Sequence, residues 1–175
     1  MMRESTDNLS FAELENIDMK FLFLLILLSC TLLLGYAQYL QYFQGLLPCP
    51  LCVAQRLAYW GLGLTAGLAL IHHPQGFVRR IYGIFLTFFA LIGGVIAARH
   101  AWLIRYPESF ECGISPEEAF LNALPIAEWW PGMFEANGDC ANIDWVFLSL
   151  TIPDWSLIAF IALGGLSAYI TLARK

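Results

Sequence analysis

The chain has 175 residues, 59% of them hydrophobic, and a formal net charge of −5. That hydrophobic share is higher than in ordinary soluble domains, so the composition excludes a water-soluble globular protein of the usual kind. We therefore expect an all-α integral membrane protein, a four-helix bundle with one long loop that carries a short interfacial helix.

Four apolar stretches are long enough to cross a bilayer core, which takes about 20 helical residues. They cover approximately residues 21–40, 53–71, 81–104 and 155–172. Residues 1–19 precede them as a polar, acidic tail, which we expect to be frayed or to lie on the membrane surface. Residues 20–175 then form a single membrane domain.

The first apolar stretch also has features of a cleaved signal. Ser29-Cys30 resembles the end of a lipoprotein signal, and a small-residue site follows at Gly35-Tyr36-Ala37. Because the apolar run continues past Cys30 to full membrane length, we expect a retained anchor helix. We interpret Cys30 as a small packing residue, and Met19 is an alternative start site.

The basic residues favour one orientation in the membrane, since they collect on the cytoplasmic side. Six lie before the first span, between the second and third, or after the fourth: Arg3, Lys20, Arg79, Arg80, Arg174 and Lys175. Only Arg56, Arg99 and Arg105 lie toward the other side. Both termini should therefore be cytoplasmic, and the loops at about 41–52 and 105–154 should face the oxidising side, where disulfides persist.

A Cys-x-x-Cys pair, Cys49-Pro50-Leu51-Cys52, stands at the start of the second span. Pro50 suits the first position of a helix, because its missing amide hydrogen would be unpaired there. A helix amino terminus favours negative charge, so at least one of the two thiols should have a lowered pKa. This arrangement favours thiol–disulfide exchange at the membrane surface.

Arg56 follows Cys52 by four residues and should lie on the same helix face, one turn deeper. One interpretation is an arginine that extends to the membrane interface. We favour the other, a fixed cation that stabilises the Cys52 thiolate, because arginines inside a span usually face a polar site. His100, near the outer end of the third span, is either an interfacial polar residue or a group that moves protons.

The long outer segment contains a helix start at Ser115-Pro116-Glu117-Glu118. Trp129 and Trp130 follow this short helix, and tryptophans are frequent at membrane interfaces. We expect the segment to lie flat on the bilayer, with a structural aromatic cluster as the alternative.

Two further cysteines, Cys112 and Cys140, lie in the same outer segment. The turn at Gly138-Asp139 should leave Cys140 exposed. Zinc binding is disfavoured because the Cys-x-x-Cys pair provides only half of a site, so we expect no metal. A structural Cys112–Cys140 disulfide remains open as an alternative.

Taken together, these motifs resemble the disulfide bond formation protein B (DsbB) family of bacterial inner-membrane quinone reductases, which keep the periplasm oxidising. The likeness extends over nearly the whole chain after residue 20. It rests on the four spans and on these positions: Pro48-Cys49-Pro50-Leu51-Cys52, Arg56, His100, Tyr106-Pro107, Cys112, Gly138-Asp139-Cys140, Pro153 and Trp155.

The resemblance implies a relay of electrons. Cys112 would form a mixed disulfide with a periplasmic DsbA-like thiol oxidase, and the released Cys140 would attack Cys49. Cys52 would then face a quinone, ubiquinone or menaquinone, with Arg56 against its ring and His100 as a neighbour.

The expected surroundings are the lipid bilayer and the membrane quinone pool, and no nucleic acid is expected. Two alternatives stay open. The chain is a paralogue that serves one dedicated oxidase, or it is a non-catalytic scaffold stapled by Cys112–Cys140.

Overall fold

The computed structural model describes residues 3–106, 116–140 and 145–173. Most of these residues are helical. Four long helices make up the body of the molecule: α1 (Arg3–Gln44), α2 (Pro50–His72), α3 (Gly76–Arg105) and α7 (Ile152–Leu172). Each contains one of the apolar stretches expected from the sequence.

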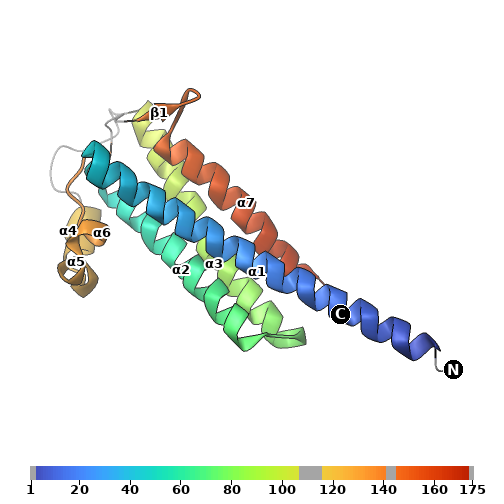
Figure 1. Ribbon diagram of the computed structural model, residues 1–175. Coiled ribbons are helices and arrows are strands. Elements are labelled where there is room, and N and C mark those ends of the chain that lie inside the picture. The colour runs from blue at the N-terminus through green and yellow to red at the C-terminus, as the bar shows by residue number, and fades with distance from the viewer. Residues whose placement is uncertain (1–2, 107–115, 141–144, 174–175) are drawn as a thin grey trace.

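The long helices run lengthwise beside one another, and consecutive helices point in opposite directions (Figure 1). α3 packs against both α2 and α7, and α1 packs against α2. α1 and α7 touch at few positions. One side of the bundle is therefore less tightly closed than the others.

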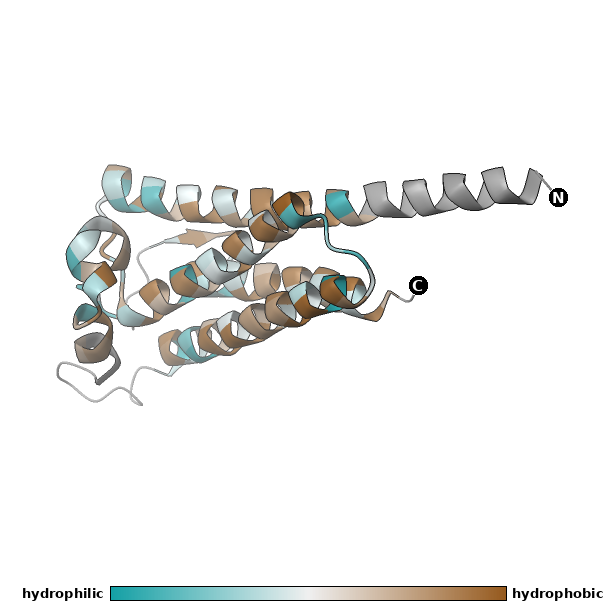
Figure 2. Cartoon of the chain, turned by 90° about the horizontal axis from the view of Figure 1, so that it is seen from below, coloured by the Kyte–Doolittle hydropathy of each residue, from teal (hydrophilic) through white to brown (hydrophobic). Residues whose placement is uncertain are grey.

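Three of these helices are long and apolar enough to cross a membrane: Met19–Gln44 within α1, with mean hydropathy 2.1, α3, with 2.2, and α7, with 1.8. Hydrophobic residues run along these helices (Figure 2). Many of them are exposed, including Leu32, Leu91 and Ile161, each more than 60% exposed. An apolar surface of this extent suits lipid rather than water. The chain is thus a helical membrane protein.

α1 begins at Arg3 and continues through residue 19 without a break in the backbone. The division between tail and membrane domain expected at residues 19 and 20 is therefore a change in composition within one helix. The amino-terminal part of α1 projects beyond the ends of the other helices (Figure 1).

Small residues let α3 and α7 pack closely. A β-carbon at Gly93 would lie 2.2 Å from the ring of Phe160, and one at Gly83 would lie 3.1 Å from the Thr171 Cα. Phe160 also stacks on Tyr59 of α2, with ring centroids 4.2 Å apart. Contacts of this kind replace the hydrophobic driving force that is missing between helices in lipid.

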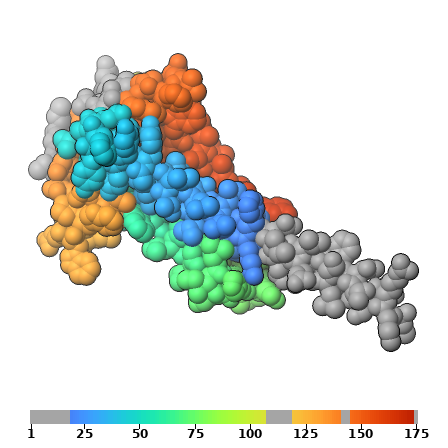
Figure 3. Space-filling view, viewed as in Figure 1, coloured from blue at the N-terminus to red at the C-terminus, as the bar shows by residue number. Residues whose placement is uncertain are grey.

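At one end of the body, three short helices follow one another: α4 (Pro116–Asn122), α5 (Pro125–Trp129) and α6 (Pro131–Phe134). The sequence predicted a single short helix here. Pro125 and Pro131 each stand at the start of a new helix, so the prolines divide the segment. In Figure 3 the atoms of this segment, in orange, lie at the same end of the molecule as the carboxyl-terminal end of α1, in cyan.

A small hairpin of β1 (Val146–Phe147) and β2 (Leu150–Thr151) precedes α7 and was not predicted. Its two turn residues, Leu148 and Ser149, have φ values of 52° and 64°. Positive φ at both positions fits the twist of a two-residue hairpin, but neither residue is one that this turn normally selects.

Candidate thiol redox site

Cys49 caps the amino terminus of α2. It has an extended backbone, with φ −80° and ψ 165°, and Pro50 follows at the start of the helix. The Cys52 backbone N–H donates to the Cys49 sulfur at 3.3 Å. The helix start predicted at the Cys-x-x-Cys pair is confirmed, and it fixes the Cys49 sulfur at the mouth of the helix.

Cys140 reaches the same place from the outer segment. The backbone N–H groups of Asn137 and Gly138 both donate to the Pro48 carbonyl oxygen at 3.0 Å. A β-carbon at Gly138 would lie 2.3 Å from the Leu47 carbonyl oxygen, so only glycine fits. The segment before Cys140 is therefore docked, backbone to backbone, on the residues before Cys49.

This docking corrects one expectation. The turn at Gly138-Asp139 was predicted to leave Cys140 exposed, but the side chain is only 2% exposed. The backbone N–H groups of Asn137 and Gly138 donate to the Pro48 carbonyl oxygen rather than to water, which carries Cys140 inward.

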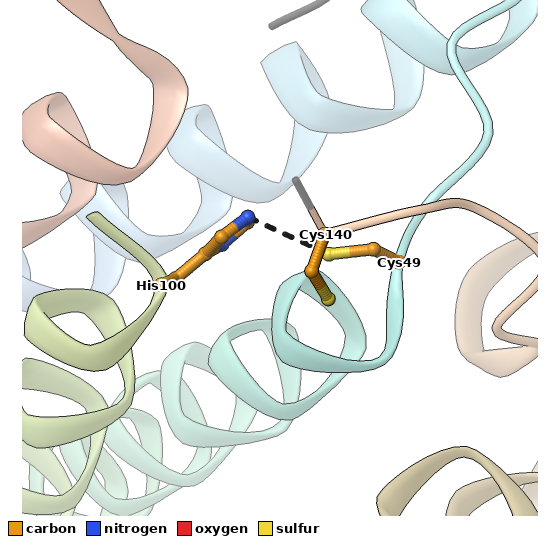
Figure 4. Close-up of side chains that lie close together, drawn as sticks. All are labelled: Cys49, His100 and Cys140. Atoms are coloured by element: carbon orange, nitrogen blue, oxygen red, sulfur yellow. Dashed lines mark hydrogen bonds between the residues drawn. The ribbon is translucent and has the colours of Figure 1, made fainter. Parts of the chain in front are cut away.

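Cys49, Cys140 and His100 meet in one buried cluster (Figure 4). Their sulfur and ring-nitrogen atoms all lie within 4.8 Å of one another. The Cys49 Sγ is 3.6 Å from the His100 Nε2. His100, predicted either as an interfacial residue or as a proton carrier, is thus 4% exposed and lies against a thiol.

The two clustered thiols differ in acidity. A hydrogen bond with Cys140 raises the pKa of Cys49 well above its usual value, and burial raises it further. The same hydrogen bond with Cys49 lowers the pKa of Cys140. Because the thiolate is the nucleophile in thiol exchange, Cys140 is the better attacking group of the pair.

Arg56 is 7% exposed, so it does not extend to solvent as one interpretation allowed. Its Nη1 donates to the Gln41 Oε1 at 2.8 Å and to the Met133 carbonyl oxygen at 3.1 Å. Arg56 also interacts electrostatically with Cys52 and Cys49. The arginine therefore joins α1, α2 and α6 and presents a fixed positive charge to the thiols.

A cavity of about 450 Å³ opens beside these groups. Side chains from α1 and α7, two helices that touch at few positions, line it together with Cys52, Arg56 and His100. A volume of this size fits a small organic ligand, and an apolar wall with a few convergent polar groups is typical of such sites.

Cys112, the remaining predicted site residue, lies outside the described residues, and so does any bond it makes with Cys140. Cys30 is 1% exposed and packs among the apolar residues of the bundle, as predicted.

Two sulfurs and an imidazole nitrogen at these distances could also hold a soft metal ion. The sequence provided only half of such a site, and the fold adds the other side chains. We interpret the cluster as an exchange centre, because the unequal acidities of Cys49 and Cys140 suit attack of one sulfur on the other.

Two site residues were missed in the sequence. The Gln55 Nε2 lies 3.2 Å from the His100 Nδ1, and Gln41 binds Arg56. A signal for Gln55 existed, since polar residues inside an apolar span tend to face a functional site. Gln41 lay in a predicted loop and had no such signal.

The helical membrane fold and the buried cluster of thiols and imidazole define a membrane protein with a thiol redox centre. Comparison with known proteins narrows this class. The model of the family described as disulfide bond formation protein DsbB matches residues 19–170.

Individual relatives agree with that match. The chain is 60% identical over 152 residues to disulfide bond formation protein B of Nitrosospira multiformis, covering 87% of this chain and 90% of the relative. It is 59% identical over 157 residues to the protein of that name from Nitrosomonas europaea, covering 90% and 96%. An Azoarcus relative is 40% identical over 155 residues, covering 88% and 93%. The chain belongs to the DsbB family, and the resemblance seen in its motifs is confirmed.

Proposed function

We propose that this protein is a thiol:quinone oxidoreductase that takes electrons from a periplasmic DsbA-like dithiol oxidase and passes them to a membrane quinone. This activity would sustain disulfide bond formation. One observation carries the proposal. The sulfurs of Cys49 and Cys140 lie within 4.8 Å of each other beside a cavity lined by Cys52 and Arg56.

The first step of the proposed path uses Cys112 as the residue that receives the partner's attack. Its role rests on the family likeness. Reduction of the Cys112–Cys140 disulfide would free Cys140 as a thiolate, which its lowered pKa favours. Its partner in the next step is Cys49, the thiol against which it is buried.

In that step the Cys140 thiolate attacks the Cys49 sulfur. The Cys49–Cys140 bond forms, the Cys49–Cys52 bond breaks, and Cys52 leaves as a thiolate. Arg56 stabilises this leaving group, because its charge is close and is held by Gln41 and Met133. The thiolate would then face the cavity.

The quinone supplies a two-electron, two-proton acceptor at this point. Three features support its placement in the cavity: the volume of about 450 Å³, the mainly apolar lining, and the presence of Arg56 and His100 in that lining. Arg56 would bind and orient a carbonyl oxygen of the ring. Ubiquinone and menaquinone both meet these requirements.

The proposed membrane arrangement adds α2 as a fourth span, in a four-helix bundle in the bacterial inner membrane. α2 has 23 residues and lies between α1 and α3. Gln55 and Arg56 of α2 are 5% and 7% exposed, which is consistent with a place for α2 inside the bundle. Both termini would be cytoplasmic, residues 1–19 would be a cytoplasmic tail before the domain of residues 20–175, and α4–α6 would lie at the periplasmic interface.

The test is anaerobic quinone reduction by the purified protein, supplied with a reduced DsbA-like oxidase and with ubiquinone or menaquinone in turn. Wild type and Cys30→Ala should form quinol, and Cys52→Ser should not. Quinol formation by Cys52→Ser would contradict the proposed path. A wild type inactive with both quinones would contradict the function and favour a scaffold stapled by Cys112–Cys140.

A further inference from the structure

We propose that Gln55, His100 and Cys49 form a hydrogen-bonded row in which Gln55 positions His100 to take the proton from the Cys49 thiol. The step served is re-formation of the Cys49–Cys52 disulfide, so the inference rests on the proposed function. His100 would be the catalytic base, and Gln55 a positioning residue that acts through His100.

The geometry of the row is complete in the described structure. The Gln55 Nε2 is 3.2 Å from the His100 Nδ1, and the His100 Nε2 is 3.6 Å from the Cys49 Sγ. The three residues are 5%, 4% and 3% exposed. Because the row is buried, protein groups rather than water hold the two nitrogens of the imidazole.

A glutamine is well suited to hold this imidazole through a change of protonation. When its amide nitrogen donates to Nδ1, the neutral ring carries its proton on Nε2, which faces Cys49. When the amide is turned, its oxygen accepts from Nδ1–H, and Nε2 is free to receive the thiol proton. In the turned orientation, the Gln55 oxygen accepts from Nδ1–H both before and after the thiol proton reaches Nε2.

The row has the general order of nucleophile, base and orienting group used in nucleophilic catalysis. Papain-like proteases place an amide side chain in the third position on an unrelated fold. Here the likeness is one of chemistry only, because the Cys49 sulfur would attack another sulfur rather than a carbonyl carbon.

Cys49 needs a base because it holds its proton tightly. Its pKa is raised by the hydrogen bond with Cys140 and by burial, so a thiol rather than a thiolate is present at neutral pH. His100 is within reach of that proton, while His72 and His73 stand at the opposite end of α2.

Before this step, the Cys112 thiol attacks the Cys140 sulfur: the Cys112–Cys140 bond forms, the Cys49–Cys140 bond breaks, and Cys49 leaves and takes up the Cys112 proton. Cys49 then loses that proton to His100 and bonds to the Cys52 sulfur. As this bond forms, the Cys49 and Cys52 sulfurs give up two electrons to the quinone. The proton held by His100 and the proton that Cys140 released on becoming a thiolate also pass to the quinone, which leaves as quinol.

The kinetic test compares two glutamines that line the same cavity. Gln55→Leu should lower kcat for quinone reduction by about 10- to 100-fold, as loss of an orienting partner commonly does, with the KM for quinone nearly unchanged. Gln41→Leu should instead raise that KM, because Gln41 holds Arg56. Gln55→Glu should restore part of kcat, since a carboxylate also accepts from Nδ1–H.

A second readout does not depend on quinone. The chain has three histidines, so ¹⁵N-histidine spectra of the reduced protein can be assigned with His72→Ala and His73→Ala. Gln55→Leu should change the Nδ1 and Nε2 signals of His100 and leave the other two histidines as they are. It should also leave the thermal unfolding temperature within a few degrees of wild type.

Unchanged His100 signals together with an unchanged kcat in Gln55→Leu would overturn the inference. A wild type without quinone activity would contradict the proposed function instead. In that case, the rate at which oxidised glutathione restores the Cys49–Cys52 disulfide provides the same comparison. An equal rate in Gln55→Leu and wild type would then refute the claim that Gln55 positions His100 for proton transfer from Cys49.

Discussion

Gly138 lies so close to Leu47 that a β-carbon on the glycine would be 2.3 Å from the Leu47 carbonyl oxygen. This contact is where the outer segment meets the residues before the Cys-x-x-Cys pair. It determines how near the Cys140 sulfur comes to the Cys49 sulfur, and the neighbouring backbone has no flexible side-chain end that could move aside.

Replacement of Gly138 by alanine should therefore separate the two sulfurs. Displacements of about 1 Å can cost roughly 100-fold in rate, so we expect Gly138→Ala to slow exchange between Cys140 and Cys49 by about 10- to 100-fold. Rapid acid quenching followed by thiol alkylation measures the exchange. Gly165→Ala is the matched control, because a β-carbon there meets nothing within 4 Å; equal rates in the two variants would contradict the docking.

Gly93 and Gly94, two neighbouring glycines of α3, test how α3 packs against α7. A β-carbon at Gly93 would lie 2.2 Å from the Phe160 ring, whereas one at Gly94 would be 3.7 Å from the Phe160 Cβ, an ordinary contact. Overpacking typically costs about 1–3 kcal/mol. Gly93→Ala should thus lower the thermal unfolding temperature in detergent clearly, and Gly94→Ala should not. Equal unfolding temperatures would show that α3 and α7 pack differently.

The acidities of the clustered thiols predict a pH dependence. Cys140 has a lowered pKa because Cys49 is its hydrogen-bond partner. In reduced protein, alkylation of Cys140 should therefore persist at pH values below the range of an ordinary thiol, about 8.5, and decline as the pH falls through the lowered pKa.

Cys49→Ala removes that hydrogen bond and should move the midpoint of Cys140 alkylation to higher pH. Measurement in a Cys30→Ala, Cys112→Ser background leaves Cys140 distinguishable from Cys49 and Cys52 by peptide mass. A midpoint that does not move when Cys49 is replaced would mean that another group sets the acidity of Cys140.

Arg56 should act on quinone affinity rather than on folding. Hydrogen bonds to charged groups contribute about 1.5–3 kcal/mol, so Arg56→Ala should raise the KM for quinone about 10-fold or more and leave the helical circular dichroism as in wild type. Arg80→Ala, at an exposed arginine near the start of α3, is the control. An unchanged KM in Arg56→Ala would remove the arginine from the proposed quinone site.

Local features of the sequence were sufficient for the helices and for the start of α2. Pro50 and the capping Cys49 act within one helix turn, so their effect is visible in four consecutive residues. The apolar length of each span is equally local. The prolines that divide α4–α6 are also local features of the sequence, but a single helix was predicted for that segment.

The site depended on contacts that sequence spacing does not show. Burial of Cys140 arises from backbone hydrogen bonds to Pro48, and nothing near Gly138 indicates that partner. His100 comes to Cys49 because α3 packs on α2. The prediction that Cys140 is exposed was wrong because a turn motif specifies the backbone locally, without specifying what the turn packs against.

The most direct test of the exchange centre is the disulfide that it should form between Cys49 and Cys140. A Cys52→Ser, Cys112→Ser variant retains only Cys30, Cys49 and Cys140. After mild oxidation, peptide mapping by mass spectrometry under non-reducing conditions should find a Cys49–Cys140 disulfide in most molecules, with Cys30 still a thiol. If Cys49 and Cys140 remain unpaired, or if either pairs with Cys30, the relay through these two sulfurs is contradicted.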